Sequence, residues 1–216
     1  MDLLEKVVIL IVILVAVSLV VFWATKAQPS QKVAPPTKSQ VEQFVYSYLS
    51  QASPGAQINI INATQSTIGN DSWDVFVGIV YNATSPCPTV VEQDYNYPAI
   101  NLAPRYDNNI TAYNNGVCTL YSGANTSIAG MNLPAIAQVK SYIGSQQART
   151  YVKTFGYNNT HVQTQFLKSF NYSGAAASHS GMIQNVWQVN YTAKIAAYSY
   201  YTILNDSGNL VFGYTQ

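Results

Sequence analysis

The sequence predicts an α+β fold: an N-terminal transmembrane helix followed by two helix-on-antiparallel-sheet units. Three observations predict it: an uncharged apolar run near the start, two segments with helical spacing of apolar residues, and strand-like segments after each of these. We divide the chain into a transmembrane anchor (1–25), a Pro-rich stalk (26–38), a first α+β unit (39–82), a disulfide-tethered insertion (83–132) and a second α+β unit (133–216).

The anchor is predicted from residues 7–24, VVILIVILVAVSLVVFWA, which contain no charge, glycine or proline. At about 1.5 Å per residue this run reaches roughly 27 Å, enough for the hydrocarbon core of a bilayer. A cleaved signal peptide is the alternative, but its apolar region is usually shorter and its start basic, whereas this start carries Asp2 and Glu5. We expect a retained single-pass helix that contacts membrane lipid.

N-glycosylation sequons set the expected orientation. Nine Asn-x-Ser/Thr triplets follow the anchor, roughly three times the number expected by chance from this composition. They begin at Asn62, Asn70, Asn82, Asn109, Asn125, Asn158, Asn171, Asn190 and Asn205. The lysines that flank the anchor favour the opposite orientation, but glycan transfer takes place on the outer face. We therefore expect a cell-membrane protein whose C-terminal domain is extracellular and carries N-linked glycans.

Composition indicates how the surface is solvated. Only 9% of the residues are charged, against a usual 25% or so, and 17 are tyrosines. Neutral polar groups keep their state in acid, which suggests an envelope exposed to acid or heat, as in many archaea; glycans that supply solubility are the alternative explanation. The net charge of +1 excludes a nucleic-acid partner.

The two cysteines, Cys87 and Cys118, are predicted to form one disulfide, because an even count in an exported domain favours pairing. Two free thiols are the alternative. Two cysteines and two distant histidines, His161 and His179, lack the spacing of a zinc site. We expect no metal and no cofactor.

The first unit begins with a helix over residues 39–51, capped by Ser39 with Glu42 as its capping-box partner, and stopped by Pro54-Gly55. Strands are expected at 56–64 and 72–82. In the second unit we expect one helix over 135–156 and strands at 160–170, 185–195, 198–205 and 209–215. The two units align faintly as a repeat that places Trp73 and Trp187 at equivalent core positions, each at the start of a strand.

The insertion at 83–132 has few strand signals and many Pro, Asn, Gly and Tyr residues. Long loops of this kind are often functional. Tyrosine presents a rigid amphipathic surface suited to glycans or proteins, so a partner surface is predicted there. Its residues are Tyr95, Tyr97, Tyr106, Tyr113 and Tyr121. The alternative is that these rings pack the insertion onto its own sheet.

One resemblance to a known family is carried by the end of the chain. Trp187-Gln188-Val189, followed by the turn Asn205-Asp206-Ser207-Gly208 and by Val211, resembles the end of a PepSY domain, one of the cystatin-like folds. The resemblance implies a helix packed across a curled antiparallel sheet. It also implies inhibitory or binding roles at cell surfaces, and brings no catalytic residues.

No catalytic constellation is predicted. The chain has no G-x-S-x-G motif. Paired carboxylates could serve calcium binding or glycoside hydrolysis, but a solvated turn explains Asp71 and Asp74; the other candidates are Glu92, Asp94 and Asp107. We expect a glycoprotein, not an enzyme, with a structural or protein-interaction role, as a surface-layer partner or an accessory subunit of a membrane complex. A PepSY-like protease inhibitor or chaperone is one alternative. A filament or virion surface subunit is another, because Glu5 before the apolar run resembles type IV pilins.

Overall fold

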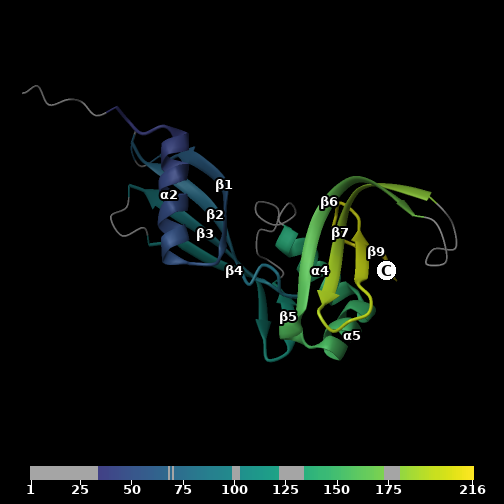
Figure 1. Cartoon of the computed structure of the whole chain (residues 1–216). Helices are drawn as coiled ribbons and strands as arrows, with labels where there is room; N and C mark the ends of the chain where they lie inside the picture. Colours follow the sequence, from purple (N-terminus) through teal and green to yellow (C-terminus); the bar gives the residue numbers. More distant parts are fainter. Residues whose placement is uncertain (1–33, 68, 70, 99–102, 122–133, 173–180) are drawn as a thin grey trace, which may run out of the picture. The chain divides into compact units, whose positions relative to one another are not determined.

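The computed structural model describes residues 34–67, 69, 71–98, 103–121, 134–172 and 181–216 (Figure 1). By its internal contacts, Pro36–Gln216 forms one unit. Strands make up 49% of the described residues, in two antiparallel sheets, with three short α-helices. The predicted fold class, α+β with a transmembrane helix and two cystatin- or PepSY-like helix-on-sheet units, is therefore wrong. No helix in the described ranges is long and apolar enough to cross a membrane, and the predicted anchor at 1–25 lies outside those ranges.

The first sheet is a five-stranded antiparallel meander in which each strand pairs with the next along the chain. Its strands are β1 (Gln57–Gln65), β2 (Trp73–Tyr81), β3 (Thr89–Tyr97), β4 (Tyr106–Asn114) and β5 (Val117–Leu120).

Residues predicted to form a loop-like insertion supply β3, β4 and β5, and this is the main reason why the fold is more β-rich than expected. In β3 the side chains of Val90, Glu92 and Asp94 are buried at alternate positions. The two-residue period of a strand is thus present, but carboxylates occupy two of these buried positions, on the sheet face opposite the core that Tyr95 enters. A pattern that depends on apolar residues at those positions does not detect such a strand.

One helix, α2 (Lys38–Ala52), packs on the first sheet, and Figure 1 shows it lying along β1 and β2. Its buried residues Val41, Val45 and Leu49 recur at i, i+4 and i+8 and meet the valines of β2. The N-cap is Thr37 rather than the expected Ser39. The Thr37 side chain accepts a hydrogen bond from the backbone N–H of Gln40, whose own side chain closes a capping box.

The second sheet has four antiparallel strands in sequential order. They are β6 (Thr160–Tyr172), β7 (Gly181–Ala193), β8 (Tyr200–Leu204) and β9 (Leu210–Thr215). Two helices, α4 (Pro134–Gly144) and α5 (Gln146–Phe155), pack against it, and a short 3₁₀ turn, η1 (Tyr157–Asn159), leads from α5 into β6.

The single helix expected over 135–156 is therefore two helices, which meet at Ser145. The Ser145 hydroxyl accepts the backbone N–H of Ala148 and so caps α5. The same hydroxyl lies 3.1 Å from the Tyr200 hydroxyl of β8, in a buried contact. The break is thus fixed by a cap and by a tertiary hydrogen bond between residues far apart in the chain.

The core between the helices and the second sheet holds a buried hydroxyl network. Ser141 of α4 lies 2.7 Å from the Tyr191 hydroxyl and 2.6 Å from the Thr202 hydroxyl, and all three residues are fully buried. Each polar group is thereby satisfied, as burial requires. The network joins α4 to β7 and β8.

The two tryptophans expected at equivalent positions differ in their setting. Trp73 opens β2 and is half-buried beside the core under α2. Trp187 lies in the middle of β7 rather than at its start, and only 7% of it is exposed.

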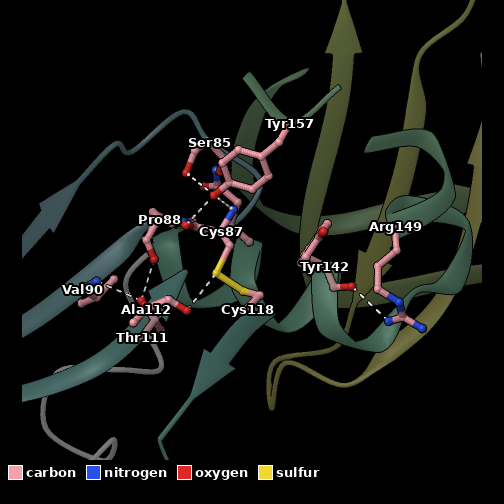
Figure 2. Close-up of a disulfide and its surroundings, with 11 residues drawn as sticks. Ser85, Cys87, Pro88, Val90, Thr111, Ala112, Cys118, Tyr142, Arg149 and Tyr157 are labelled. Atoms are coloured by element: carbon pink, nitrogen blue, oxygen red, sulfur yellow. Dashed lines mark hydrogen bonds between the residues drawn. A yellow bond between two sulfur atoms is a disulfide. The ribbon is translucent and has the colours of Figure 1, made fainter. Parts of the chain in front are cut away.

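The predicted disulfide between Cys87 and Cys118 is present and joins the segment before β3 to β5 (Figure 2). The two Cα atoms lie 5.9 Å apart. Tyr157 of η1 donates a hydrogen bond to the carbonyl of Cys87 and accepts one from its N–H, at 3.0 and 3.3 Å. The disulfide therefore lies at the first sheet, and the Tyr157 hydrogen bonds connect it to the η1 turn that leads into β6.

Candidate functional site

The face of the second sheet that points away from α4 and α5 is the candidate site. Side chains alternate along a strand, so β7 directs Trp187, Val189 and Tyr191 into the core with the helices. Gln188 and Asn190, between them, point to the opposite face and are half-buried. The same alternation applies to the neighbouring strands.

Amide side chains from two strands gather on this face. Gln163 and Gln165 of β6 are the direct cross-strand partners of Asn190 and Gln188. Gln165 Nε2 donates a hydrogen bond to Gln188 Oε1. Gln188 Nε2 in turn donates to the Tyr214 hydroxyl of β9 at 2.9 Å.

Tyrosine rings continue the surface across the next two strands. Tyr201 of β8 is opposite Asn190 on one side and opposite Tyr214 on the other. The Tyr201 and Tyr214 rings stack with centroids 5.0 Å apart and planes 9° apart. We call the combined surface the amide–aromatic face; its residues are Gln163, Gln165, Gln188, Asn190, Tyr201 and Tyr214.

More aromatic rings lie near the C-terminal end of β6 and on β9. Phe212 of β9 lies 5.4 Å from Tyr172 and 6.1 Å from Phe170, measured between ring centroids. Burial raises the pKa of the Tyr214 hydroxyl, and the hydrogen bond from Gln188 opposes part of that rise. The hydroxyl therefore stays protonated at neutral pH and can both donate and accept hydrogen bonds.

A cavity of about 690 Å³ opens beside this face, around the edge of β6. Five residues of the amide–aromatic face line it, together with amides such as Gln57 and Gln216. No charged side chain is among the lining residues that the structure describes. Its size lies within the roughly 300–1,000 Å³ typical of small-molecule sites. One polar atom in the lining, Asn190 Oδ1, is buried without a hydrogen-bond partner in the described part of the chain.

The described tyrosines of the predicted partner surface differ in their settings. Tyr95 is only 3% exposed and belongs to the core under α2. Tyr97 packs edge-on against the ring of Phe44, and Tyr113 stacks on Tyr157 at 4.0 Å.

The remaining two are a residue of β4 and a residue just after β5. Tyr106 begins β4, and its side chain lies outside what the structure describes. Tyr121 is 41% exposed. Sequence reasoning missed the amide–aromatic face, whose signal was the two-residue spacing of amides at Gln163/Gln165 and Gln188/Asn190.

The predicted glycosylation sites differ in accessibility. Exposed sequon asparagines in the described ranges are Asn62, Asn82, Asn109, Asn158 and Asn171. Asn190 and Asn205 are half-buried, and Asn70 and Asn125 lie outside the described ranges.

The acidic residues show no metal-binding arrangement. Within the described ranges, no group of three or more His, Cys, Asp and Glu side chains could hold a metal ion. Asp74 forms an ion pair with Arg105 at 2.6 Å. Glu92 and Asp94 are 3% and 8% exposed, and burial raises the pKa of both carboxyls.

The histidines and the other two carboxylates are dispersed. Asp71, Asp107 and His161 are exposed, and His179 lies outside the described ranges. The three described residues among them are not lining residues of the cavity.

Comparison of the chain with protein-family models, with curated protein sequences and with solved structures gave no match.

Proposed function

We propose that this protein is an extracellular envelope glycoprotein that binds a neutral carbohydrate through its amide–aromatic face. It is located at the cell membrane with residues 39–216 outside the cell, as their sequons indicate. Its role is recognition within the envelope rather than catalysis. This proposal differs from the structural or protein-interaction role expected from the sequence, because the partner is a carbohydrate.

The observation that carries the proposal is the cavity whose lining includes seven amide side chains and Tyr201 beside small and apolar residues of α4 and β6, with no charged side chain among its described lining residues. Sugar hydroxyls both donate and accept hydrogen bonds. Each Gln or Asn side chain offers two donors and one acceptor carbonyl, which matches that need. An ionic ligand would leave its charge uncompensated in such a lining.

The aromatic side of the face supplies the second part of carbohydrate recognition. A sugar ring has an apolar C–H surface, which packs against flat aromatic rings. Tyr201 lines the cavity and stacks on Tyr214, so its ring is held in a fixed orientation. The hydrogen bond from Gln188 to the Tyr214 hydroxyl fixes the position of the second ring of this stacked pair. A preorganised face of this kind loses less entropy on binding.

The test is binding of the full-length, detergent-solubilised protein, freed of its own glycans, to a panel of neutral oligosaccharides, measured by calorimetry. Gln188→Ala and Tyr201→Ala are each expected to weaken binding about tenfold, on the order of 1.4 kcal/mol. Gln147→Ala on the exposed part of α5 and Tyr46→Ala on the exposed part of α2 are matched controls and should leave affinity unchanged. Failure of the stripped protein to bind any neutral oligosaccharide would contradict the proposal.

A further inference from the structure

Among the sequon asparagines that the structure describes, Asn190 is the one that lines the cavity beside the amide–aromatic face. Other described sequon asparagines have different settings: Asn171, for example, is exposed on β6. Asn205 lies in the turn before β9, where its side chain accepts the backbone N–H of Asn209 at 2.8 Å. Asn190 Oδ1, by contrast, is buried and has no hydrogen-bond partner in the described part of the chain.

Strand register fixes what surrounds a group attached to Asn190. Gln163 of β6 and Tyr201 of β8 are its direct neighbours across the sheet. Both of these residues also line the cavity. Directly opposite side chains in an antiparallel pair have Cβ atoms about 4.5–5.5 Å apart, so a sugar joined to Asn190 Nδ2 lies over these two side chains.

We propose that N-glycosylation of Asn190 controls the amide–aromatic face: the first sugar of an Asn190-linked glycan occupies the cavity and excludes an external carbohydrate. The inference deepens the proposed function, on which its binding readout rests. In a chain glycosylated at Asn190, the attached sugar fills the cavity. The cavity is open to an external carbohydrate only in a chain that carries no glycan at Asn190. Exposed sequons such as Asn62 and Asn171 do not affect the site.

The modification itself is a group transfer from an activated glycan donor of the lipid-phosphate class. The bond between the sugar C1 and Asn190 Nδ2 forms as the bond from C1 to the phosphate oxygen breaks. The lipid phosphate leaves with the bonding electron pair, and Nδ2 loses one proton. Because β7 is paired on both sides, we place this step before β6 and β8 close the sheet around it.

Three variants of the full chain, produced in a host that N-glycosylates, test the inference. Thr192→Val removes the Asn190 sequon while leaving Asn190 in place, and Thr192→Ser keeps the sequon. Thr64→Val removes the Asn62 sequon on an exposed part of β1 and is the matched control. Glycopeptide mass spectrometry determines the occupancy of Asn190, and retention on an immobilised neutral oligosaccharide gives the fraction of binding-competent protein.

We expect the Thr192→Val protein to bind in full. In the Thr192→Ser and Thr64→Val proteins, we expect loss of binding in the fraction that carries a glycan at Asn190. Equal retention of Asn190-modified and Asn190-unmodified chains would overturn the inference, as would complete absence of glycan at Asn190 in every preparation.

A second readout separates this inference from the proposed function. A glycan seated in the cavity should be released by a glycoamidase much more slowly from the folded protein than from the unfolded protein, whereas the glycan at Asn171 should be released at similar rates from both. If unglycosylated protein binds no sugar, the proposed function fails, but protection of the Asn190 glycan still supports the occupancy inferred here. Equally rapid release at Asn190 and Asn171 from the folded protein overturns it.

Discussion

Glu92 and Asp94 are the residues whose burial has the clearest energetic consequence. Both carboxyls lie on β3 with little exposed surface, and Asp94 Oδ1 has no hydrogen-bond partner among the described residues. Burial raises the pKa of both groups; at Asp94 the Arg105 charge opposes the rise and the Asp74 charge adds to it. A buried carboxyl with a raised pKa stabilises the fold in its protonated form.

The pH dependence of folding follows from the sign of these shifts. Since the pKa in the folded state exceeds that in the unfolded state, the stabilisation is complete below the unfolded values near pH 4 and is lost as the pH rises through the folded values. Glu92→Gln is therefore expected to increase the free energy of unfolding at pH 7 and to flatten its dependence on pH. Urea denaturation at pH 3.5, 5 and 7 measures both effects.

Glu42→Gln on α2 is the control for this experiment, because its carboxylate is 33% exposed and lies 3.8 Å from the Lys38 ammonium at the surface. An equal gain at pH 7 in both variants, or a loss in Glu92→Gln, would show that burial of Glu92 is not the cause.

Sequence patterns predicted elements well where apolar residues carry the period. β2, with Val75, Val77 and Ile79 facing the core, was expected over nearly its full length. β3 was not expected, because the carboxylates Glu92 and Asp94 occupy two of its alternating buried positions. The break at Ser145 was also missed, since the hydrogen bond that fixes it comes from Tyr200 of β8.

The amide–aromatic face could not be predicted as a unit for a similar reason. Gln165 and Gln188 lie on strands that the sequence predicts, yet they become neighbours only through the register of β6 against β7. Register depends on the hairpin between the strands and on the core beneath them. The abundance of tyrosine in residues 83–132 drew the prediction there, whereas Tyr201 and Tyr214 of the second sheet form the observed surface.

At the scale of elements, the disulfide connects the two ends of the segment that carries β3 and β4. The linked cysteines are 31 residues apart in the sequence. On the chain-entropy account, a cross-link over such a loop stabilises the fold by roughly 3–4 kcal/mol. Cys87→Ala/Cys118→Ala is expected to lower the free energy of unfolding by about that amount, as measured by urea denaturation.

Peptide mapping without reductant is the companion measurement for this prediction. It should recover one linked peptide pair from the native protein. Two alkylatable thiols, or a double variant as stable as the parent, would contradict the role assigned to the bond.

At the scale of the whole molecule, the segment between the cysteines is scaffold. Residues 89–116 include all of β3 and β4, which are the third and fourth strands of the first sheet. Replacing them with a short Gly/Ser link that keeps both cysteines is expected to abolish the five-stranded sheet, because β2 loses one of its two pairing partners and β5 loses β4, the strand it pairs with. Circular dichroism and limited proteolysis should show the loss of cooperative unfolding.

The control is Asn115→Gly in the turn after β4, where φ is 50° and glycine is well tolerated. This variant should unfold as the parent does. If the protein with residues 89–116 replaced still resists proteolysis and unfolds cooperatively, the segment is a dispensable insertion and the prediction is wrong.

The uncharged lining of the cavity has a consequence for the surroundings in which the protein can work. Attraction between charges is screened within about 10 Å at 0.1 M salt and about 3 Å at 1 M, whereas amide hydrogen bonds and ring stacking depend little on added ions. Amides do not titrate, and a phenol releases its proton only in strong alkali. Attachment through this face should thus be equally firm in brine, in fresh water and in acid, even while the buried carboxyls of the first sheet make the stability of the fold itself respond to pH.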